Sequence, residues 1–213
     1  MKKFGINQIL VYIKEKMKLN IKNFQFTITK SDRELVTNHK SHLVWLTGLS
    51  GSGKSTLANL VEIELNKRNI LTYVIDGDNI RQRINSDLNF GIKDRVENIR
   101  RISELSKLLV DAGIFVIACF ISPFSRDRLA VKNNLGEKNF SEIYINASIE
   151  SCEIRDVKGL YKKARKGEIK NFTGISSPYE APINPDLEIK TDQLPIKKCS
   201  ELIINFITSN ILK

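Results

Sequence analysis

The chain has few cysteines, and their spacing excludes a disulfide framework. Only 3 of its 213 residues are cysteine, at positions 119, 152 and 199, and no two of them form a Cys-X-X-Cys pair. Such sparse use is typical of a reducing compartment, so we expect a cytoplasmic protein. Cys119 lies inside an apolar run, which indicates a small core residue rather than a reactive thiol.

Long hydrophobic runs are also missing. No apolar stretch approaches the length of about 18 residues that a membrane-spanning helix needs, so no membrane association is expected. Residues 1–20 are basic, and their apolar patch at 9–13 is too short for the core of a secretory signal. We predict a flexible extension at residues 1–23 and one domain at residues 24–213, which is an ordinary domain length.

Acidic residues are in deficit. The chain has 34 Lys and Arg against 24 Asp and Glu, which gives a formal net charge of +10. A basic balance suits nucleic acid, an acidic membrane surface or small phosphorylated molecules. Neither zinc-finger spacing nor an aromatic-rich platform accompanies the densest basic segment, residues 158–170, so a nucleic-acid partner is not expected.

A phosphate-binding loop is the most informative feature that is present. Residues 48–55 read Gly-Leu-Ser-Gly-Ser-Gly-Lys-Ser, between a short apolar run and a segment with helical periodicity. The glycines allow backbone N–H groups to surround phosphates, Lys54 would reach the β- and γ-phosphates of ATP, and Ser55 would bind magnesium. The predicted nucleotide-binding residues are Gly48, Leu49, Ser50, Gly51, Ser52, Gly53, Lys54, Ser55 and Thr56.

Alternation of apolar runs with helical patterns predicts an α/β fold with a doubly wound, mainly parallel five-stranded sheet and helices on both faces. Asp94 is the expected N-cap of the longest helix. Residues 156–182 break the alternation, because they are basic, polar and rich in glycine and proline, and a long insert of this kind is usually functional. The expected strands are 43–46, 71–75, 114–121, 142–145 and 187–189, and the expected helices are 56–65, 94–112, 125–134 and 195–211.

Polar residues follow the predicted strands where ligands bind in an open α/β sheet, at the carboxyl ends. Asp76 and Asp78 follow the second strand, and two carboxylates beside a phosphate loop can hold magnesium and orient an attacking hydroxyl. Gly77 between them allows a substrate to approach closely. An Asx-type turn that caps the next helix is the alternative. Ser122 follows the third strand.

Taken together, these motifs resemble the adenylyl-sulfate kinase family of P-loop kinases. The resemblance runs from about residue 24 to the end and departs from the family at Ser176, where an acidic residue is usual. It implies phosphorylation of the 3′-hydroxyl of adenosine 5′-phosphosulfate (adenylyl sulfate) by ATP with Mg²⁺ in sulfate assimilation, and a homodimer. The segments that carry it are 45–56, 76–81, 94–101, 120–124, 158–165, 171–174 and 177–182.

The resemblance also assigns roles to single residues. It makes Asp78 the main candidate for orienting or deprotonating the 3′-hydroxyl, with Asp76 assisting magnesium, and residues 156–182 a mobile lid. Phe90 and Phe172 would hold the adenine between their rings, although Phe90 could also be an ordinary core residue. The substrate-binding residues that it implies are Arg81, Phe90, Arg95, Asn98, Ile121, Lys158, Leu160 and Phe172.

More than one role is possible for the Ser122 hydroxyl. Family descriptions give the serine at this position to a phosphorylated enzyme intermediate. Direct in-line transfer from ATP to a ribose hydroxyl needs no covalent step, so the hydroxyl could equally position the substrate or shape the turn before Pro123.

Two other functions remain to be weighed. Another P-loop small-molecule kinase would share the phosphate loop, but the basic motif at 158–165 speaks against it. A non-catalytic nucleotide switch would need a guanine-reading motif after the phosphate loop. The one match, at residues 29–32, precedes the loop and therefore fails on order.

Overall fold

The computed structural model describes residues 24–212, and the predicted extension at 1–23 lies outside the described residues. Within the described range the chain forms a sheet of five strands that all run parallel, in the order β2-β3-β1-β4-β5. The predicted α/β class and strand count are confirmed. The strands are β1 (Leu43–Thr47), β2 (Thr72–Asp76), β3 (Phe115–Cys119), β4 (Phe140–Asn146) and β5 (Leu187–Lys190).

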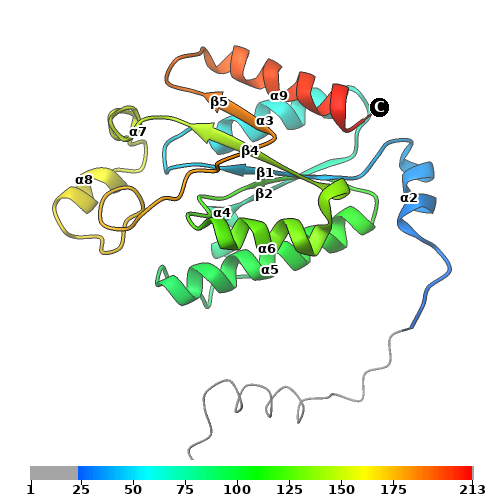
Figure 1. Ribbon diagram of the computed structural model, residues 1–213, viewed down its shortest axis with the longest axis horizontal. Helices are drawn as coiled ribbons and strands as arrows, with labels where there is room; N and C mark the ends of the chain where they lie inside the picture. The colour runs from blue at the N-terminus through cyan, green and yellow to red at the C-terminus, as the bar shows by residue number, and fades with distance from the viewer. Residues whose placement is uncertain (1–23, 213) are drawn as a thin grey trace, which may run out of the picture.

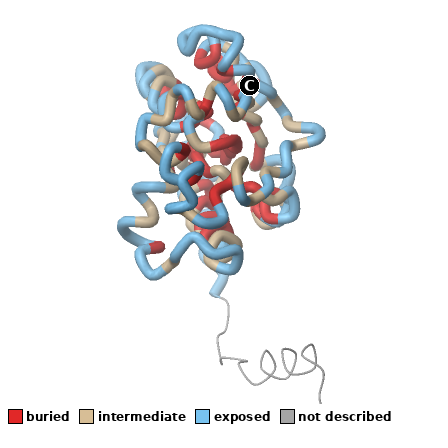
Figure 2. Tube along the Cα trace, turned by 90° about the vertical axis from the view of Figure 1, so that its left-hand side faces the viewer, coloured by how far each residue is buried: buried red, intermediate tan, exposed pale blue. Residues whose placement is uncertain are grey.

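Helices cover both faces of the sheet, as Figure 1 shows. α3 (Lys54–Lys67) and α9 (Ile196–Asn210) pack on one face, and α5 (Ile92–Asp111) and α6 (Ser125–Leu135) pack on the other. The central strand β1 is buried throughout, with Val44 and Leu46 in one core and Leu43 and Trp45 in the other. Figure 2 shows the buried residues gathered toward the middle of the fold and the exposed residues toward its outside.

Several shorter helices were not expected from periodicity. They are α2 (Lys30–Thr37), α4 (Gly77–Arg81), α7 (Ile149–Arg155), α8 (Leu160–Arg165) and the 3₁₀ turn η1 (Glu137–Asn139). Such short helices give little periodic signal, and side-chain caps start three of them, α2, α4 and α7. Thr29 and Asp32 form a capping box at the start of α2, and the Asp76 carboxylate caps α4.

The predicted start of the longest helix was wrong by two residues. α5 begins at Ile92 with Gly91 as its N-cap. Asp94 lies in the first turn, and its carboxylate accepts a hydrogen bond of 3.2 Å from the Asn89 N–H outside the helix. The acidic side chain therefore serves the preceding loop and the positive end of the helix rather than the cap position.

The direction in which the chain crosses the sheet reverses between β1 and β3. The chain leaves β1 toward α3 on one face, whereas it leaves the neighbouring strand β3 toward α6 on the other face. Ligands bind at such switch points in open α/β sheets, outside the carboxyl ends of the strands. The phosphate loop after β1, the turn at Ser122 after β3 and the Asp76 segment after β2 all lie at this edge.

Candidate active site

The phosphate loop has the backbone conformation that its glycines allow. Gly53 is the N-cap of α3 and has a φ of 102°, in the left-handed region where side chains are strained. Gly48 is needed for space as well, because a Cβ there would lie 2.3 Å from the Ile145 carbonyl oxygen. The loop therefore leads directly into the positive end of α3, an arrangement suited to phosphate.

Lys54 is folded against its own loop. Its Nζ donates to the carbonyl oxygens of Gly48 at 2.9 Å and Leu49 at 2.6 Å, and the side chain is buried. Burial lowers the pKa of Lys54 from 10.5 to about 8. Burial thus disfavours the ammonium charge, and the two carbonyl oxygens partly compensate for the water that it loses.

Two residues that sequence reasoning missed support the loop from its outer side. Thr191, just after β5, donates from Oγ1 to the Ser52 carbonyl oxygen at 2.8 Å. Arg155, at the end of α7, donates to the Thr191 carbonyl oxygen at 2.7 Å and to the Gly51 carbonyl oxygen at 3.3 Å. No periodicity marks these positions, because the contacts join parts of the chain that are far apart in sequence.

The structure brings the two predicted magnesium residues together. Ser55 Oγ donates to Asp76 Oδ2 at 2.6 Å, while Asp76 Oδ1 accepts from the Asp78 N–H at 3.0 Å. Asp76 therefore also caps α4, which confirms the capping interpretation, and its role in magnesium binding stays a prediction. A hydroxyl and a carboxylate are hard oxygen ligands of the kind that Mg²⁺ takes beside phosphates, so the pair fits that ion.

Asp78 contacts the lid, the name we keep for residues 156–182. Lys158 Nζ forms an ion pair with Asp78 Oδ2, and both side chains are more than half exposed. This pair joins the predicted catalytic carboxylate to the segment that sequence analysis expected to cover the site. Its exposure means that the pair itself contributes little to stability.

Ser122 lies inside the protein rather than on an open surface. Its residue is 2% exposed and has a φ of 39°. Its Oγ accepts from Trp45 Nε1 at 3.0 Å and donates to Thr47 Oγ1 at 2.9 Å. The neighbouring Ile121 contributes its carbonyl oxygen, which accepts from Thr47 Oγ1 at 2.8 Å. Both residues thus shape the strand end, and a hydroxyl engaged in this way is a poor nucleophile.

Arg81, the last residue of α4, contacts Phe90, which lies in the loop just before α5. The Arg81 guanidinium lies over the Phe90 ring at 4.6 Å and donates to the Asn89 carbonyl oxygen at 2.9 Å. Burial lowers the pKa of Arg81. Phe90 is 65% exposed, which rules out the alternative that it is a core residue.

Arg95 joins this loop to the far part of the lid. It donates to the Phe90 carbonyl oxygen at 2.9 Å, the Asn171 carbonyl oxygen at 2.6 Å and Thr173 Oγ1 at 2.7 Å. Asn98, one turn along α5, is buried and accepts from Asn85 Nδ2 at 2.9 Å. The predicted substrate residues on α5 therefore face the loop and the lid.

The lid is more than a solvated run of charge. Tyr161 and Phe172 are buried and pack edge to face, with ring centroids 4.9 Å apart, and Leu160 packs against their cluster. The cluster includes Leu49 of the phosphate loop, and Tyr161 OH donates to the Ser50 carbonyl oxygen at 2.9 Å. Phe172 thus faces its own lid cluster, whereas the Phe90 ring is exposed under Arg81.

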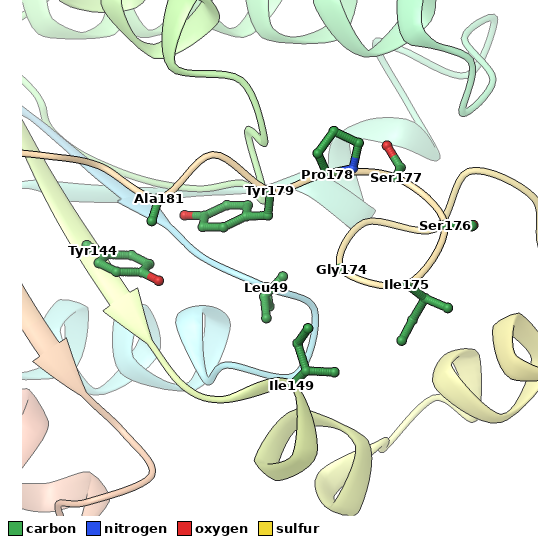
Figure 3. Close-up of a pocket in the computed structure, with 10 residues that line it drawn as sticks. All are labelled: Leu49, Tyr144, Ile149, Gly174, Ile175, Ser176, Ser177, Pro178, Tyr179 and Ala181. Carbon is green, nitrogen blue, oxygen red and sulfur yellow. The ribbon is translucent and has the colours of Figure 1, made fainter.

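A hollow of about 630 Å³ lies between the phosphate loop and the returning part of the lid (Figure 3). Of the predicted site residues, only Leu49 lines this hollow. Ser176, the position at which this chain differs from the family pattern, also lines the hollow. Its Oγ accepts a hydrogen bond from the Phe172 N–H at 2.9 Å and so closes a turn of the lid. The lining residues are Leu49, Tyr144, Ile149, Gly174, Ile175, Ser176, Ser177, Pro178, Tyr179 and Ala181.

The described part of the chain contains neither a cluster of candidate metal ligands nor a helix that could span a membrane. Within residues 24–212, no group of three or more His, Cys, Asp and Glu side chains could hold a metal ion. Over the same range no helix combines the length and the apolar character needed to cross a membrane.

A phosphate loop on β1, acidic side chains after β2 and a basic lid define the class as P-loop phosphotransferases. The family model for adenylylsulphate kinase matches residues 40–190, and the chain belongs to that family. The adenylyl-sulfate kinase of Thermodesulfovibrio yellowstonii is 54% identical over 185 residues, which cover 86% of this chain and 92% of that protein. The probable adenylyl-sulfate kinase of Bacillus subtilis is 55% identical over 84% of this chain and 89% of its own length.

A solved structure agrees with the family. The Mycobacterium tuberculosis APS kinase CysC in complex with AMPPNP and APS superimposes with a TM-score of 0.77 at 44% identity. The match covers 80% of this chain and 99% of that chain. More distant solved kinases, such as a sugar kinase from Janibacter at 17% identity, share the fold alone.

Proposed function

We propose that this chain transfers the γ-phosphate of ATP to the 3′-hydroxyl of adenylyl sulfate, which yields 3′-phosphoadenylyl sulfate and ADP in sulfate assimilation. Family membership supports the reaction, and so does the complex of the Mycobacterium tuberculosis kinase with AMPPNP and APS. The observation that carries the proposal is the contact of the lid residue Lys158 with Asp78, next to the pair formed by Ser55 and Asp76.

On the donor side, the phosphate loop positions ATP. Its backbone N–H groups and the start of α3 hold the phosphates, and Lys54 exchanges its carbonyl partners for phosphate oxygens. Mg²⁺, when bound at Ser55 and Asp76, offsets negative charge on the phosphates. Lys54 stabilises the charge that spreads over the transferred group.

On the acceptor side, Asp78 orients the 3′-hydroxyl and accepts its proton, and Lys158 holds that carboxylate until the acceptor arrives. Arg81 and Arg95 bind the sulfate–phosphate end through guanidinium groups, which suit such anions. Phe90 offers one face for the adenine. Phe172 offers the second face once its ring leaves the lid cluster. Asn98, Ile121 and Leu160 complete the acceptor pocket, and the basic lid excludes water.

The experiment is a coupled assay of ADP release with Mg²⁺ and ATP, in the presence of adenylyl sulfate, AMP or gluconate in turn. Of these three acceptors, we expect only adenylyl sulfate to support ADP release. The Lys54→Ala variant serves as control, since loss of one such electrostatic contact commonly lowers turnover by about 10²–10³. Comparable turnover of gluconate or AMP, with none of adenylyl sulfate, would show that the assignment is wrong.

The remaining assignments are a homodimer, a requirement for Mg²⁺ and a cytoplasmic location. Light scattering should give twice the mass of one 24.3 kDa chain. Removal of Mg²⁺ with a chelator should abolish ADP release, and added Mg²⁺ should restore it. Fractionation of cells should place the protein in the cytoplasm.

A further inference from the structure

The returning end of the lid is tied to the sheet by hydrogen bonds to buried polar groups. We call this set the root network. It joins the end of β1, the turn after β3, the start of α6 and the last residues of the lid. No pattern in the sequence indicates it, because its members come from four separate segments. The members are Trp45, Thr47, Ser122, Arg128, Tyr179 and Glu180.

The donor and the acceptor of each hydroxyl hydrogen bond in the root network follow from the proton of Thr47. Thr47 gives its only hydroxyl proton to the Ile121 carbonyl oxygen, at 2.8 Å. Its Oγ1 therefore accepts from Ser122 at 2.9 Å, and the Tyr179 hydroxyl, 3.0 Å away, must donate to it. Burial raises the pKa of Tyr179, so this phenol remains a donor. Lid residue Tyr179 is thus bonded to the residue that directly precedes Gly48.

Arg128 holds the other half of the root network. The residue is 3% exposed, and its three nitrogens donate to three segments. Nε donates to the Glu142 carboxylate at 2.5 Å, one terminal nitrogen to the Ser122 carbonyl oxygen at 2.8 Å, and the other to the Glu180 carbonyl oxygen at 2.8 Å. Only a planar guanidinium offers donors in this fixed fork, so lysine could not replace all three bonds.

Glu180 adds two further links from the lid to the same turn. Its N–H donates to the Pro123 carbonyl oxygen at 2.8 Å, and its carboxylate accepts from the Ser125 N–H at 2.8 Å at the start of α6. A carboxylate at a helix start is favourable. Tyr179 and Glu180 therefore attach the lid to β1, to the turn after β3 and to the start of α6.

Before this point the lid is bonded to Ser50 through Tyr161 and to Arg95 through Asn171 and Thr173, and these partners belong to the predicted nucleotide and acceptor sites, whereas the root network lies behind them. Lys158 reaches Asp78 in an exposed pair, and the turn at 174–178 borders the hollow shown in Figure 3, which Tyr179 closes at one end. The attached end of the lid, at Tyr179 and Glu180, thus lies beside the hollow. This is the geometry of a hinge, in which one segment moves while its attachment stays fixed.

We propose that Arg128 is a positioning residue that fixes the lid at Tyr179–Glu180, so that the lid closes over the acceptor nucleotide from a fixed pivot. The inference rests on the proposed function, since the acceptor is adenylyl sulfate. Arg128 is buried and bonds only to protein groups, so it acts on the acceptor through Ser122 and Glu180.

The test is the Arg128→Lys variant of the full chain, which keeps the charge beside Glu142 but loses the fork. We expect the KM for adenylyl sulfate to rise about tenfold and the KM for ATP to change by less than about twofold, because small misplacements near a reacting group have large kinetic effects. Trp45 is the one tryptophan of the chain and bonds to Ser122, so its fluorescence reports the root network directly. Its response to adenylyl sulfate should be smaller in the variant.

Arg33→Lys is the matched control, because Arg33 bonds to Asp111 on α5 outside the root network. It should leave both KM values and the Trp45 response unchanged. If Arg128→Lys does not fold, Tyr179→Phe removes one hydroxyl and should shift the same KM in the same direction. A folded variant with lower stability but an unchanged ratio of the two KM values would overturn the proposal. Absence of turnover by the unaltered chain would instead refute the proposed function, and Trp45 titration would still test the anchor.

Discussion

Mild acid should destabilise this protein through one buried histidine. His42 lies directly before β1, and its Nε2 is 2.9 Å from Ser141 Oγ on the neighbouring strand β4. Its ring stacks on Phe115 at 6.2 Å. Burial, together with the positive charge of Lys30, lowers the pKa of His42 from 6.5 to about 4. The folded state therefore holds this imidazole neutral.

The direction of the change in stability follows from the pH at which each state binds the proton. The unfolded chain takes up a proton at His42 as the pH falls through about 6.5, whereas the folded chain does so only near 4, so stability is lost over that window. At 1.36 kcal/mol per pH unit, the full difference corresponds to about 3 kcal/mol. Between about pH 7 and about pH 5 the expected loss is about 2 kcal/mol.

The assay is urea unfolding followed by Trp45 fluorescence at these two pH values, for the unaltered chain and for His42→Gln. Glutamine keeps a polar contact to Ser141 but does not titrate, so the variant should lack the pH-dependent loss. His39→Gln is the matched control, since it retains His42 and should retain the loss. Carboxylates contribute equally to each protein and cancel in the comparison. An equal loss in His42→Gln would refute the reasoning.

Four further substitutions at the site have expected outcomes. Asp78→Asn should suppress phosphate transfer while ATP binding, measured by titration, stays close to normal, and near-normal turnover would exclude its catalytic role. Ser122→Ala should keep measurable turnover and lose about 1–3 kcal/mol of stability in urea, because it leaves the Trp45 N–H buried without a partner. A kinetically competent phosphoserine at Ser122, trapped by mass spectrometry, would contradict this. Phe90→Ala should weaken adenylyl sulfate binding by about 1–3 kcal/mol with little effect on ATP. Phe172→Ala should do the same and also loosen the lid cluster. Equal losses for both nucleotides would mean that the rings are packing residues.

Local patterns in the sequence were sufficient for the strands and the phosphate loop. The continuous apolar runs that became β1 and β3 are read without knowledge of neighbours, since a strand buried on both faces has no polar position. The loop motif determines backbone shape through its glycines, and Gly48 and Gly53 show the close approach and the left-handed conformation that such residues allow. The resemblance to a family extended this to the lid.

Tertiary structure alone decided which side chains meet. Lys158 and Asp78 are 80 positions apart, and their contact depends on how the lid crosses the end of β2. Arg128 offers one sequence signal, a charge on the same helix face as Val131 and Leu135, but its partners lie on β4, the Ser122 turn and the lid. Periodicity encodes which face of an element is buried, whereas the partner of a buried polar group is set by topology, because only the folded chain brings distant donors and acceptors within hydrogen-bond distance.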